Sequence, residues 1–414
     1  MKAAAAAVAI EGGALPLGGG LLALVRPALE LLEPEGVLAV LSTSPAVRED
    51  LPSWCRVERL EYLGCEPTAD ARQRHLLRKP SGEAREMPAP SPLPLREGRL
   101  LAADVLAAHP MPEGARADTG FAPRGARVEP GGPAYPFTLL ERDHVAPPDV
   151  GALYDQAVAS QWDATRDIPW DMVGRHPPEL ESAVGQIMTF LAENELSALY
   201  VPARFLPRIH PAYAEVAMFL ATQLADEARH IDVFLKRARV VGGRLGVSAV
   251  TTSRSLLSLL ELEDFTEAAF LLSVLGEGTF LDLLRFVEEH APDEATAELV
   301  RRARNDESRH VHFGLAHVRH ALAHDPTLYG RLEAAVRRRA ATLHGVGGVP
   351  APLQDALTVL AAGGTGPRDI ARGHDAFRAL LDTMHEGRMR RLRHAGFTAE
   401  QAQVLSDLHT PTFM

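Results

Sequence analysis

The sequence predicts an α+β protein of two domains, in which a small mixed domain precedes a larger and mainly helical one. Three observations support this class. Short apolar runs in residues 1–80 mix strand-like with helical spacing, residues 81–148 are rich in proline and glycine, and long amphipathic stretches dominate residues 149–414. Apolar residues make up 46% of the 414 residues, which is enough to bury a sizeable core.

The first domain shows a small α/β or α+β pattern. The run VLAVLS at residues 37–42 predicts a strand, and LLALVRPALELL at 21–32 has helical spacing. Residues 57–64 and 72–79 are further strand candidates. The apolar run at the start of the chain ends at Glu11 without a cleavage context, so we do not interpret it as a signal peptide.

The segment 81–148 is expected to be a linker with little regular structure, although RLLAADVLAAH within it has helical spacing. Beyond the linker, strand-like alternation disappears, and glycine and proline supply the stop signals between helices. The expected helices lie at residues 150–160, 177–200, 210–242, 253–261, 264–290, 294–323, 327–344, 351–361 and 368–395.

Charge and composition argue against several classes of protein. The formal net charge of -11 argues against a nucleic-acid binder, which usually needs a basic face. No stretch of about 18 uninterrupted apolar residues exists, so no membrane span is expected. The only two cysteines, Cys55 and Cys65, argue against a disulfide framework or a cysteine-based zinc site and indicate a cytoplasmic protein.

One five-residue phrase, Asp-Glu-x-Arg-His, occurs twice, in ADEARHIDVF and, 80 residues later, in NDESRHVHFG. Residues i and i+3 of a helix lie on nearly the same face, so Glu227 and His230 point one way, as do Glu307 and His310. A carboxylate and an imidazole on one face can bind the same metal ion. A single copy is typical of many solvated helices, whereas two copies beside apolar residues predict a metal centre.

A four-helix bundle with such a centre needs two more carboxylates, each on the helix before one of the motifs. Two antiparallel helices and a turn take about 30 residues. Glu195 lies 32 residues before Glu227, in phase with neighbouring apolar residues, and Glu277 lies 30 residues before Glu307 among apolar residues and glycines. Glu193 is off the apolar stripe and is the second choice. Four carboxylates and two histidines therefore have coherent spacing.

This set of side chains is oxygen-rich and lacks thiolates, so it suits iron or manganese better than copper or structural zinc. Two bound ions would also explain why buried carboxylates are tolerated. Ligand histidines usually donate their other ring N–H to a carboxylate, and Asp226 and Asp306 can accept it, each from the histidine of the opposite motif. Arg229 and Arg309 can then pair with these aspartates; the alternative for all four residues is a set of surface ion pairs.

The doubled phrase resembles the motifs of the ferritin-like di-iron carboxylate superfamily, over roughly residues 150–400. The resemblance implies a ferritin-like four-helix bundle with extra helices, two Fe ions (with Mn as the alternative) and O2 as co-substrate. Phe234 stands where reductase small subunits carry a radical tyrosine, and Ala303 where arylamine N-oxygenases carry an extra histidine. These departures favour an oxidase or monooxygenase. By this resemblance the metal ligands are Glu195, Glu227, His230, Glu277, Glu307 and His310.

Residues 21–64 look like the TusA-like family of small sulfur carriers, through the Pro-x-Gly that ends the first helix, the strand VLAVLS and the stretch EDLPSWC. The resemblance implies a two-layer α/β sandwich. Gly18 lies near the place of the family's persulfide-carrying cysteine, and no cysteine precedes Cys55. Because sulfur transfer needs a thiol nucleophile, we expect a docking or ligand-positioning module and not a sulfurtransferase.

Two other features near the motifs are interpreted as structural. His312, His317 and His320 share a helix with His310 and are expected to be packing or surface residues. The segment QWDATRDIPWD, at 161–171, carries two tryptophans that we interpret as packing anchors, with a substrate gate as the alternative.

Three hypotheses on function follow. The first is an oxygen-dependent di-iron oxidase or oxygenase acting on a small organic substrate, which needs an electron-transfer partner. The alternative is a non-catalytic metal-binding protein for iron storage or sensing. The third is an interaction protein whose bundle holds no metal, which would leave buried carboxylates with raised pKa values. The sequence leaves the substrate, the redox partner and the oligomeric state open.

Overall fold

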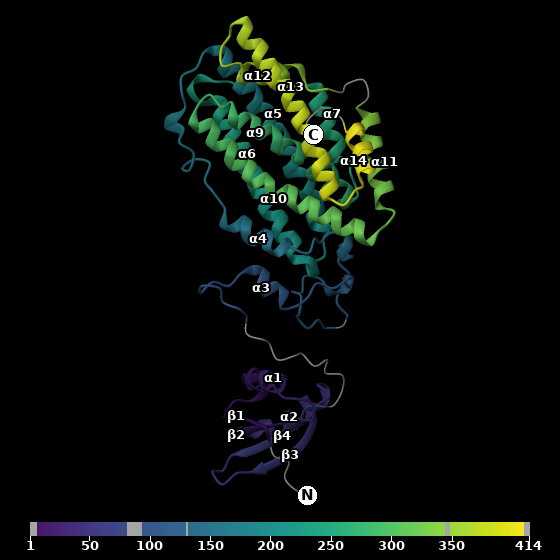
Figure 1. The fold of residues 1–414 in the computed structure, drawn as a ribbon. Coiled ribbons are helices and arrows are strands. Elements are labelled where there is room, and N and C mark those ends of the chain that lie inside the picture. Colours follow the sequence, from purple (N-terminus) through teal and green to yellow (C-terminus); the bar gives the residue numbers. More distant parts are fainter. Residues whose placement is uncertain (1–5, 81–92, 130, 344–347, 410–414) are drawn as a thin grey trace. The chain divides into compact units, whose positions relative to one another are not determined.

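The computed structural model describes residues 6–80, 93–129, 131–343 and 348–409. The chain divides into two compact units, residues 1–92 and 93–414 (Figure 1). The predicted border between the first domain and the linker adjoins residues 81–92, which lie outside the described residues. The first unit is a small mixed α/β structure and the second is helical, as the sequence predicts.

A four-stranded mixed sheet forms one layer of the first unit. Its strands stand in the order β1-β2-β4-β3, with β1 parallel to β2 and the other neighbours antiparallel. The side chains of β2 are buried on both faces of the sheet, because Leu38 and Val40 pack with Leu77 on one face and Ala39 packs with Leu76 on the other. The strands are β1 (Val8–Gly13), β2 (Val37–Ser42), β3 (Glu61–Pro67) and β4 (Gln73–Arg78).

Two helices, α1 (Leu22–Glu30) and α2 (Pro45–Val57), form the second layer. Both contribute buried side chains to the core cluster on the face of Leu38 and Leu77, so the unit is a two-layer α/β sandwich. The sequence pattern predicts α1 but neither α2 nor β1. The strand expected at residues 57–64 begins only at Glu61, because α2 continues to Val57.

Residues 93–149, which include most of the predicted linker, pack with the helical unit. Regular structure here is limited, within the described residues, to α3 (Ala102–Ala107) and the 3-10 turns η2 (Ala117–Thr119) and η3 (Arg142–His144). The carboxylate of Asp155 accepts hydrogen bonds from the first two amides of α3, at 3.0 and 2.9 Å. Tyr213 donates to the carbonyl of Leu140 at 2.6 Å. These bonds hold the segment against the helices.

The centre of the second unit is a bundle of four long helical elements. In Figure 1 they are coloured from teal to green in the order of the sequence. Pro177 and Pro178 start the first of them, and the Asp293 carboxylate caps the last by accepting from Thr296 N at 2.7 Å. The short connection 206–213 makes the first two helices antiparallel. The elements are α5 (Pro178–Phe205), α6 (Ala214–Arg239), the run α8 (Phe265–Ala269), η8 (Phe270–Glu277) and α9 (Gly278–Glu289), and α10 (Glu294–His324).

The helix expected at 264–290 is interrupted by η8, a π-helical segment. Its wider turns change which residues face the core just before Glu277, and π-segments inside α-helices are frequent at functional sites. Gly314 of α10 lies against it: a Cβ there would come within 2.6 Å of the Ser273 Cβ. Glycine at this position therefore allows α10 to approach η8 closely.

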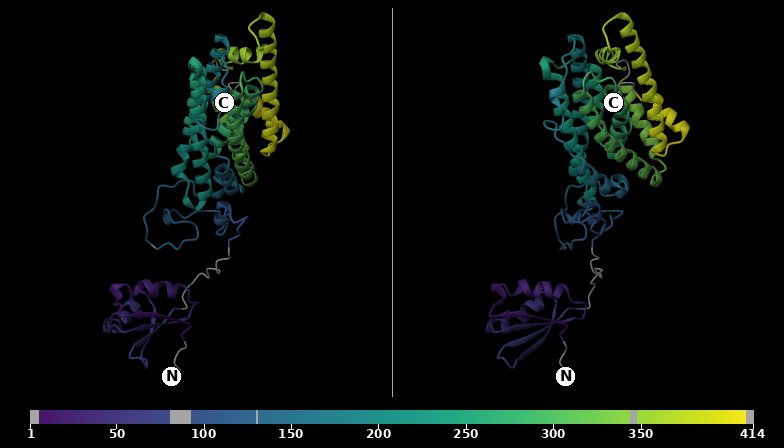
Figure 2. Two further views of the ribbon diagram at one scale, coloured as in Figure 1. Left: turned by 90° about the vertical axis from the view of Figure 1, so that its left-hand side faces the viewer. Right: turned by 60° about the vertical axis from the view of Figure 1, so that its left-hand side comes forward.

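Further helices surround the bundle. α4 packs on α6, α12 packs on α5, and α13 packs on both α9 and α12. Figure 2 shows α13, in yellow, along one side of the bundle. The last helix begins with a capping box between Thr398 and Gln401 and is not among the helices expected from the sequence. These helices are α4 (Val150–Ala159), α7 (Val250–Leu260), α11 (Leu328–Thr342), α12 (Ala351–Ala362), α13 (Pro367–His394) and α14 (Ala399–Leu408).

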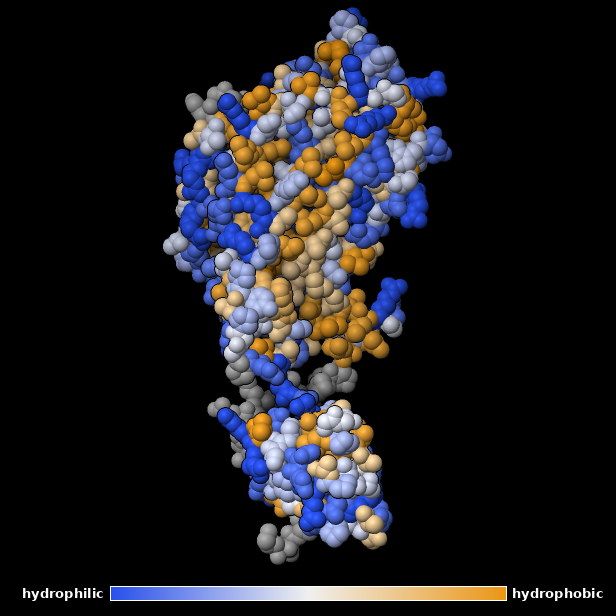
Figure 3. All heavy atoms as spheres, turned by 180° about the vertical axis from the view of Figure 1, so that it is seen from behind, coloured by the Kyte–Doolittle hydropathy of each residue, from blue (hydrophilic) through white to orange (hydrophobic). Residues whose placement is uncertain are grey.

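The surface of the helical unit is mixed in polarity. In Figure 3 apolar side chains gather over the middle of one face, and hydrophilic ones gather towards its margins. Among the described residues, no helix has both the length and the apolar character needed to cross a membrane.

Candidate metal centre

All six predicted ligand side chains meet inside the bundle. Glu195 comes from α5, Glu227 and His230 come from α6, Glu277 ends the π-segment η8, and Glu307 and His310 come from α10. Each is at most 3% exposed. Buried ionisable groups are rare unless they are paired or bind a metal, so their convergence in one core needs a chemical reason.

The six side chains divide into two sets of four that share two members. The potential ligand atoms within each set lie within 4.8 Å of one another. Glu227 and Glu307 belong to both sets, whereas each histidine and each of the other two carboxylates belongs to one. This is the arrangement expected of two adjacent ions bridged by two carboxylates. The sets are Glu195, Glu227, His230 and Glu307, and Glu227, Glu277, Glu307 and His310.

The two imidazoles face the shared carboxylates through the same ring nitrogen. His230 Nδ1 lies 3.3 Å from Glu227 Oε2 and 3.2 Å from Glu307 Oε1. His310 Nδ1 lies 3.0 Å from Glu227 Oε1 and 3.3 Å from Glu307 Oε2. The shared glutamates thus turn one oxygen to each side of the centre. Glu195 is 3.6 Å from His230 Nδ1 and closes one side.

The second nitrogen of each imidazole faces the aspartate of the opposite motif. His230 Nε2 lies 3.2 Å from Asp306 Oδ2, and His310 Nε2 lies 3.3 Å from Asp226 Oδ2. The arginine of each motif contacts both aspartates. The geometry is a closed ring of charge-assisted contacts around the centre, with both aspartates at most 2% exposed.

Gln161 and Trp162, which follow α4, complete this outer ring. Trp162 donates its indole N–H to Asp306 Oδ2 at 2.7 Å, and its ring stacks with His230 at a centroid distance of 6.4 Å. Gln161 donates to Asp226 Oδ1 at 3.1 Å. The segment interpreted as carrying packing anchors therefore also positions the two aspartates. The sequence gives no signal for this role, because Trp162 is 144 residues from its partner.

Burial and charge set the protonation of the centre. Burial raises the pKa of Glu195 and Glu277 well above the usual range, and the charge of Glu307 adds to the effect. Burial alone would also raise the pKa of Glu227, but the His310 charge and the closeness of both imidazoles to its carboxylate outweigh burial and lower that pKa.

The two histidines show the opposite balance. Burial lowers the pKa of His230 and His310, but the carboxylates around both rings outweigh it, and each pKa lies well above its usual value. The raised pKa values favour the protonated forms of the two histidines and of the two outer glutamates. A divalent cation that binds here displaces protons from its ligands.

The side chains fit a metal pair on the chemistry of their donors. Six atoms of the centre are buried without a hydrogen-bond partner among the described residues, and such atoms are costly unless something else binds them. They are Glu195 Oε1, both oxygens of Glu227, Glu277 Oε2, Glu307 Oε1 and His230 Nδ1. Four carboxylates could neutralise two divalent ions, and the set is hard and free of sulfur.

A small apolar cavity of about 20 Å³ adjoins the centre. Phe205, Leu220 and Phe313 lie in its wall. Two polar wall residues link it to the ligands: Gln223 donates to Glu277 Oε1 at 3.4 Å, and Ser273 also hydrogen-bonds this carboxylate. A space of this size admits one water-sized molecule.

The other residues considered from the sequence lie outside the cluster. Glu193, the second choice on α5, hydrogen-bonds Ser248 and belongs to neither set. His317 is fully buried and shares a hydrogen bond of 3.0 Å with Thr266, so it is a packing residue. His312 pairs with Asp149 at 2.7 Å on the surface. Phe234 packs beside His230, with ring centroids 6.4 Å apart.

No protein-family model matches the sequence, and none of the curated proteins matches it. Among solved structures, the chain is similar to variants of an R2-like ligand-binding oxidase. One, with an aerobically reconstituted Mn/Fe cofactor, has a TM-score of 0.48 at 17% identity, over 60% of this chain and 93% of its own. Another, with an aerobically reconstituted Fe/Fe cofactor, has a TM-score of 0.47 at 17% identity, over 60% and 93%.

Proposed function

We propose that the helical unit is an oxygen-dependent dinuclear oxidoreductase, an oxidase or monooxygenase with two iron ions as the cofactor and manganese as the alternative. The observation that carries the proposal is the sharing of Glu227 and Glu307 between two sets of four donors. A single ion would not use six buried side chains from four helical elements. Two carboxylates common to both sets are what a bridged pair of ions requires.

The bound metals would supply the redox chemistry with dioxygen, which protein side chains cannot perform. The chain supplies orientation and a protected site. Asp226 and Asp306 fix the imidazoles by accepting from the nitrogens that do not face the carboxylates. Glu195 and Glu277 can hold or release a proton, because burial raises their pKa values. The apolar wall of the cavity excludes bulk water from the side of Glu277.

The cavity supports dioxygen as the co-substrate, because it is apolar and has room for one small molecule. A small organic substrate of the kind we propose needs more space, so its binding would require side chains such as Phe205 and Phe313 to move apart. Two parts of this proposal, the small organic substrate and the electron-transfer partner of the enzyme, rest on the resemblance to the di-iron carboxylate superfamily and on the chemistry of the centre.

The size of the cavity also favours a second candidate function, a non-catalytic metal-binding protein for iron storage or sensing. Such a protein needs the six donors but no room for an organic molecule. The two functions differ in turnover, since only the oxidoreductase consumes oxygen repeatedly when a reductant is supplied.

The experiment begins with metal content per chain, by elemental analysis, on protein expressed with iron. We expect close to two irons, and oxygen uptake that continues while a chemical reductant lasts and that is lost in Glu227→Ala. Two irons with a single round of oxygen uptake would favour the non-catalytic function. Folded protein with little or no metal would refute both. Far-ultraviolet circular dichroism of the variant checks that its helices remain formed.

For the first unit we propose a docking or ligand-positioning role, in the manner of a TusA-like domain without its active thiol. Cys55 is fully buried in the core between α2 and the sheet, so it cannot carry a group to a partner. Cys65 lies on β3, away from the start of α1, where the sulfur carriers hold their cysteine. A persulfide trapped on either cysteine by mass spectrometry would overturn this proposal.

A further inference from the structure

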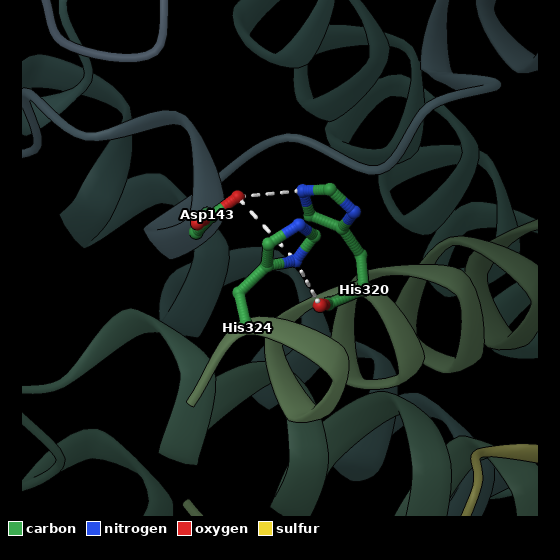
Figure 4. Close-up of side chains that lie close together, drawn as sticks. All are labelled: Asp143, His320 and His324. Carbon is green, nitrogen blue, oxygen red and sulfur yellow. Dashed lines mark hydrogen bonds and ion pairs between the residues drawn. The ribbon is translucent and has the colours of Figure 1, made fainter. Parts of the chain in front are cut away.

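A second cluster of metal-ligating side chains lies on the same long helix as the second motif but further along. His320 and His324 stand four residues apart near the end of α10, so both rings project from one face. Asp143 reaches them from the 3-10 turn η3. Figure 4 shows its carboxylate directed at both imidazoles. One ligand atom from each of the three residues lies within 4.8 Å of the other two.

The contacts favour a shared ion over a simple ion pair. Asp143 Oδ1 lies 2.8 Å from His320 Nε2 and 3.7 Å from His324 Nδ1. His320 Nε2 is buried and has no partner in hydrogen-bond geometry among the described residues, although the carboxylate is this close. One carboxylate faces two imidazoles, whose lone pairs can bind a cation together with it when both rings are neutral.

The cluster is partly exposed to solvent, most of all at His324. The side chain of His320 is 13% exposed and that of Asp143 is 35% exposed, whereas His324 is 50% exposed. An ion can therefore enter from the solvent at His324. The Nδ1 of His324 donates to the carbonyl of His320 at 2.8 Å, and ligation through this nitrogen would replace that one solvent-accessible bond. The remaining coordination positions would face water.

We propose that Asp143, His320 and His324 form a mononuclear site for a divalent transition metal ion of the zinc type. Two imidazoles and one carboxylate are typical ligands of zinc, whereas the dinuclear centre is dominated by carboxylates. His320 lies ten residues from His310, about 15 Å along the helix, so the two sites do not share ligands. The proposal is independent of the function proposed for the dinuclear centre.

The ion would act as a clip. η3 belongs to the segment that leads into α4, and its backbone is also bonded to the preceding loop, where Arg142 N donates to Glu113 O at 2.9 Å. A metal bound by one residue of η3 and two of α10 joins elements that are far apart in sequence. Because the unfolded chain does not present these ligands together, zinc would stabilise the folded helical unit.

The test uses the full chain and zinc alone, with zinc per chain measured by elemental analysis after equilibration at a fixed micromolar concentration of free zinc. We expect His320→Ala and Asp143→Asn to hold one zinc ion fewer than the wild type, whatever the dinuclear centre binds. His312→Ala is the matched control: His312 is on the same helix, is also 50% exposed and also faces an aspartate, but has no second histidine beside it. It should keep the wild-type number.

A second variant and readout guard against misfolding. His324→Gln changes the most exposed of the three ligands and should leave the circular dichroism spectrum unchanged. We expect zinc to raise the Tm of the wild type and of His312→Ala, and to raise that of His324→Gln less. Equal zinc content and an equal rise in Tm for wild type and all variants would overturn the proposal. Because the predicted result is a difference of one ion, failure of the dinuclear centre to bind metal would not imitate either outcome.

Discussion

His230 Nε2 lies 3.2 Å from the carboxylate of Asp306, which belongs to the other copy of the Asp-Glu-x-Arg-His phrase. The reciprocal contact joins His310 to Asp226 at 3.3 Å. Each copy therefore supplies a glutamate and a histidine to the centre and an aspartate to the histidine of its partner copy. Each half of the centre therefore depends on the other, and substitution of one aspartate should change the orientation of the histidine on the opposite helix.

Asp306→Asn should weaken metal binding without removing a ligand. The amide of asparagine has the shape of the carboxylate but no charge. It therefore holds His230 less strongly and is a weaker acceptor for the indole N–H of Trp162. Loss of such a partner typically lowers metal affinity about 10- to 100-fold. Competition with a chelator of known affinity measures the change. The control is Asp232→Asn on α6, whose carboxylate is half exposed and pairs with Lys236. Equal affinities for the two variants would contradict the orienting role.

Removal of a shared glutamate should cost more metal than removal of an unshared one. Glu227 belongs to both donor sets and Glu195 to one, so we expect Glu227→Ala to lose both ions and Glu195→Ala to retain one. Metal content per folded chain decides the point. Glu193→Ala, two residues from Glu195 but bonded to Ser248, should retain both. Identical losses in Glu195→Ala and Glu227→Ala would show that the carboxylates are not shared as the geometry indicates.

The convergence of the six side chains could be predicted from the sequence because the spacings that produce it are encoded locally. The i, i+3 spacing within α6 and α10 places each Glu with its His, and the length of a helical hairpin places Glu195 and Glu277 about 30 residues before them. Both spacings follow from helix geometry along the chain, even though the π-segment η8 widens the turns before Glu277, so they can be found without knowledge of tertiary packing. The sharing of Glu227 and Glu307 depends on how four elements meet, and only the structure reveals it.

Other features depend on contacts that leave no local pattern. Trp162 reaches Asp306 across 144 residues of sequence, and Asp143 reaches His320 from a turn inside the predicted linker. The π-segment η8 reads as an ordinary apolar helix, because periodicity does not distinguish the two over eight residues. In the first unit, Pro52 inside α2 weakens its helical signal, which explains why that helix is not predicted.

The two cysteines should differ in reactivity. Cys55 is fully buried, and burial raises the pKa of its thiol to about 11, so roughly one molecule in a thousand is ionised at pH 8. Cys65 is partly exposed and donates to Gln73 Oε1 at 2.6 Å. We expect iodoacetamide to modify Cys65 first and Cys55 only after denaturation, as measured by mass spectrometry over time. In the folded Cys65→Ser variant, iodoacetamide should modify no cysteine, because the remaining Cys55 is buried. Rapid labelling of Cys55 in folded protein would refute its place in the core.

The stability of the helical unit should fall in mild acid because of His317. Burial, and then the nearby charges of His320 and His144, lower the pKa of His317 to about 3. A histidine in the unfolded chain takes up a proton near pH 6.5. Between that pH and the folded pKa, the unfolded state binds one proton more than the folded state, which lowers the free energy of unfolding. The cost at pH 5 is about 2 kcal/mol, and it grows until the pH approaches the folded pKa.

His317→Gln removes this titration and keeps a polar group that can reach Thr266, whose hydroxyl shares a hydrogen bond of 3.0 Å with the native ring. The measurement is urea unfolding of the metal-free chain, followed by circular dichroism at pH 7 and pH 5. We expect the wild type to lose about 2 kcal/mol more than His317→Gln between the two pH values. His312→Gln, exposed on the same helix, should lose as much as the wild type. If all three lose the same amount, His317 accepts its proton in the folded state and is not the source of the acid sensitivity.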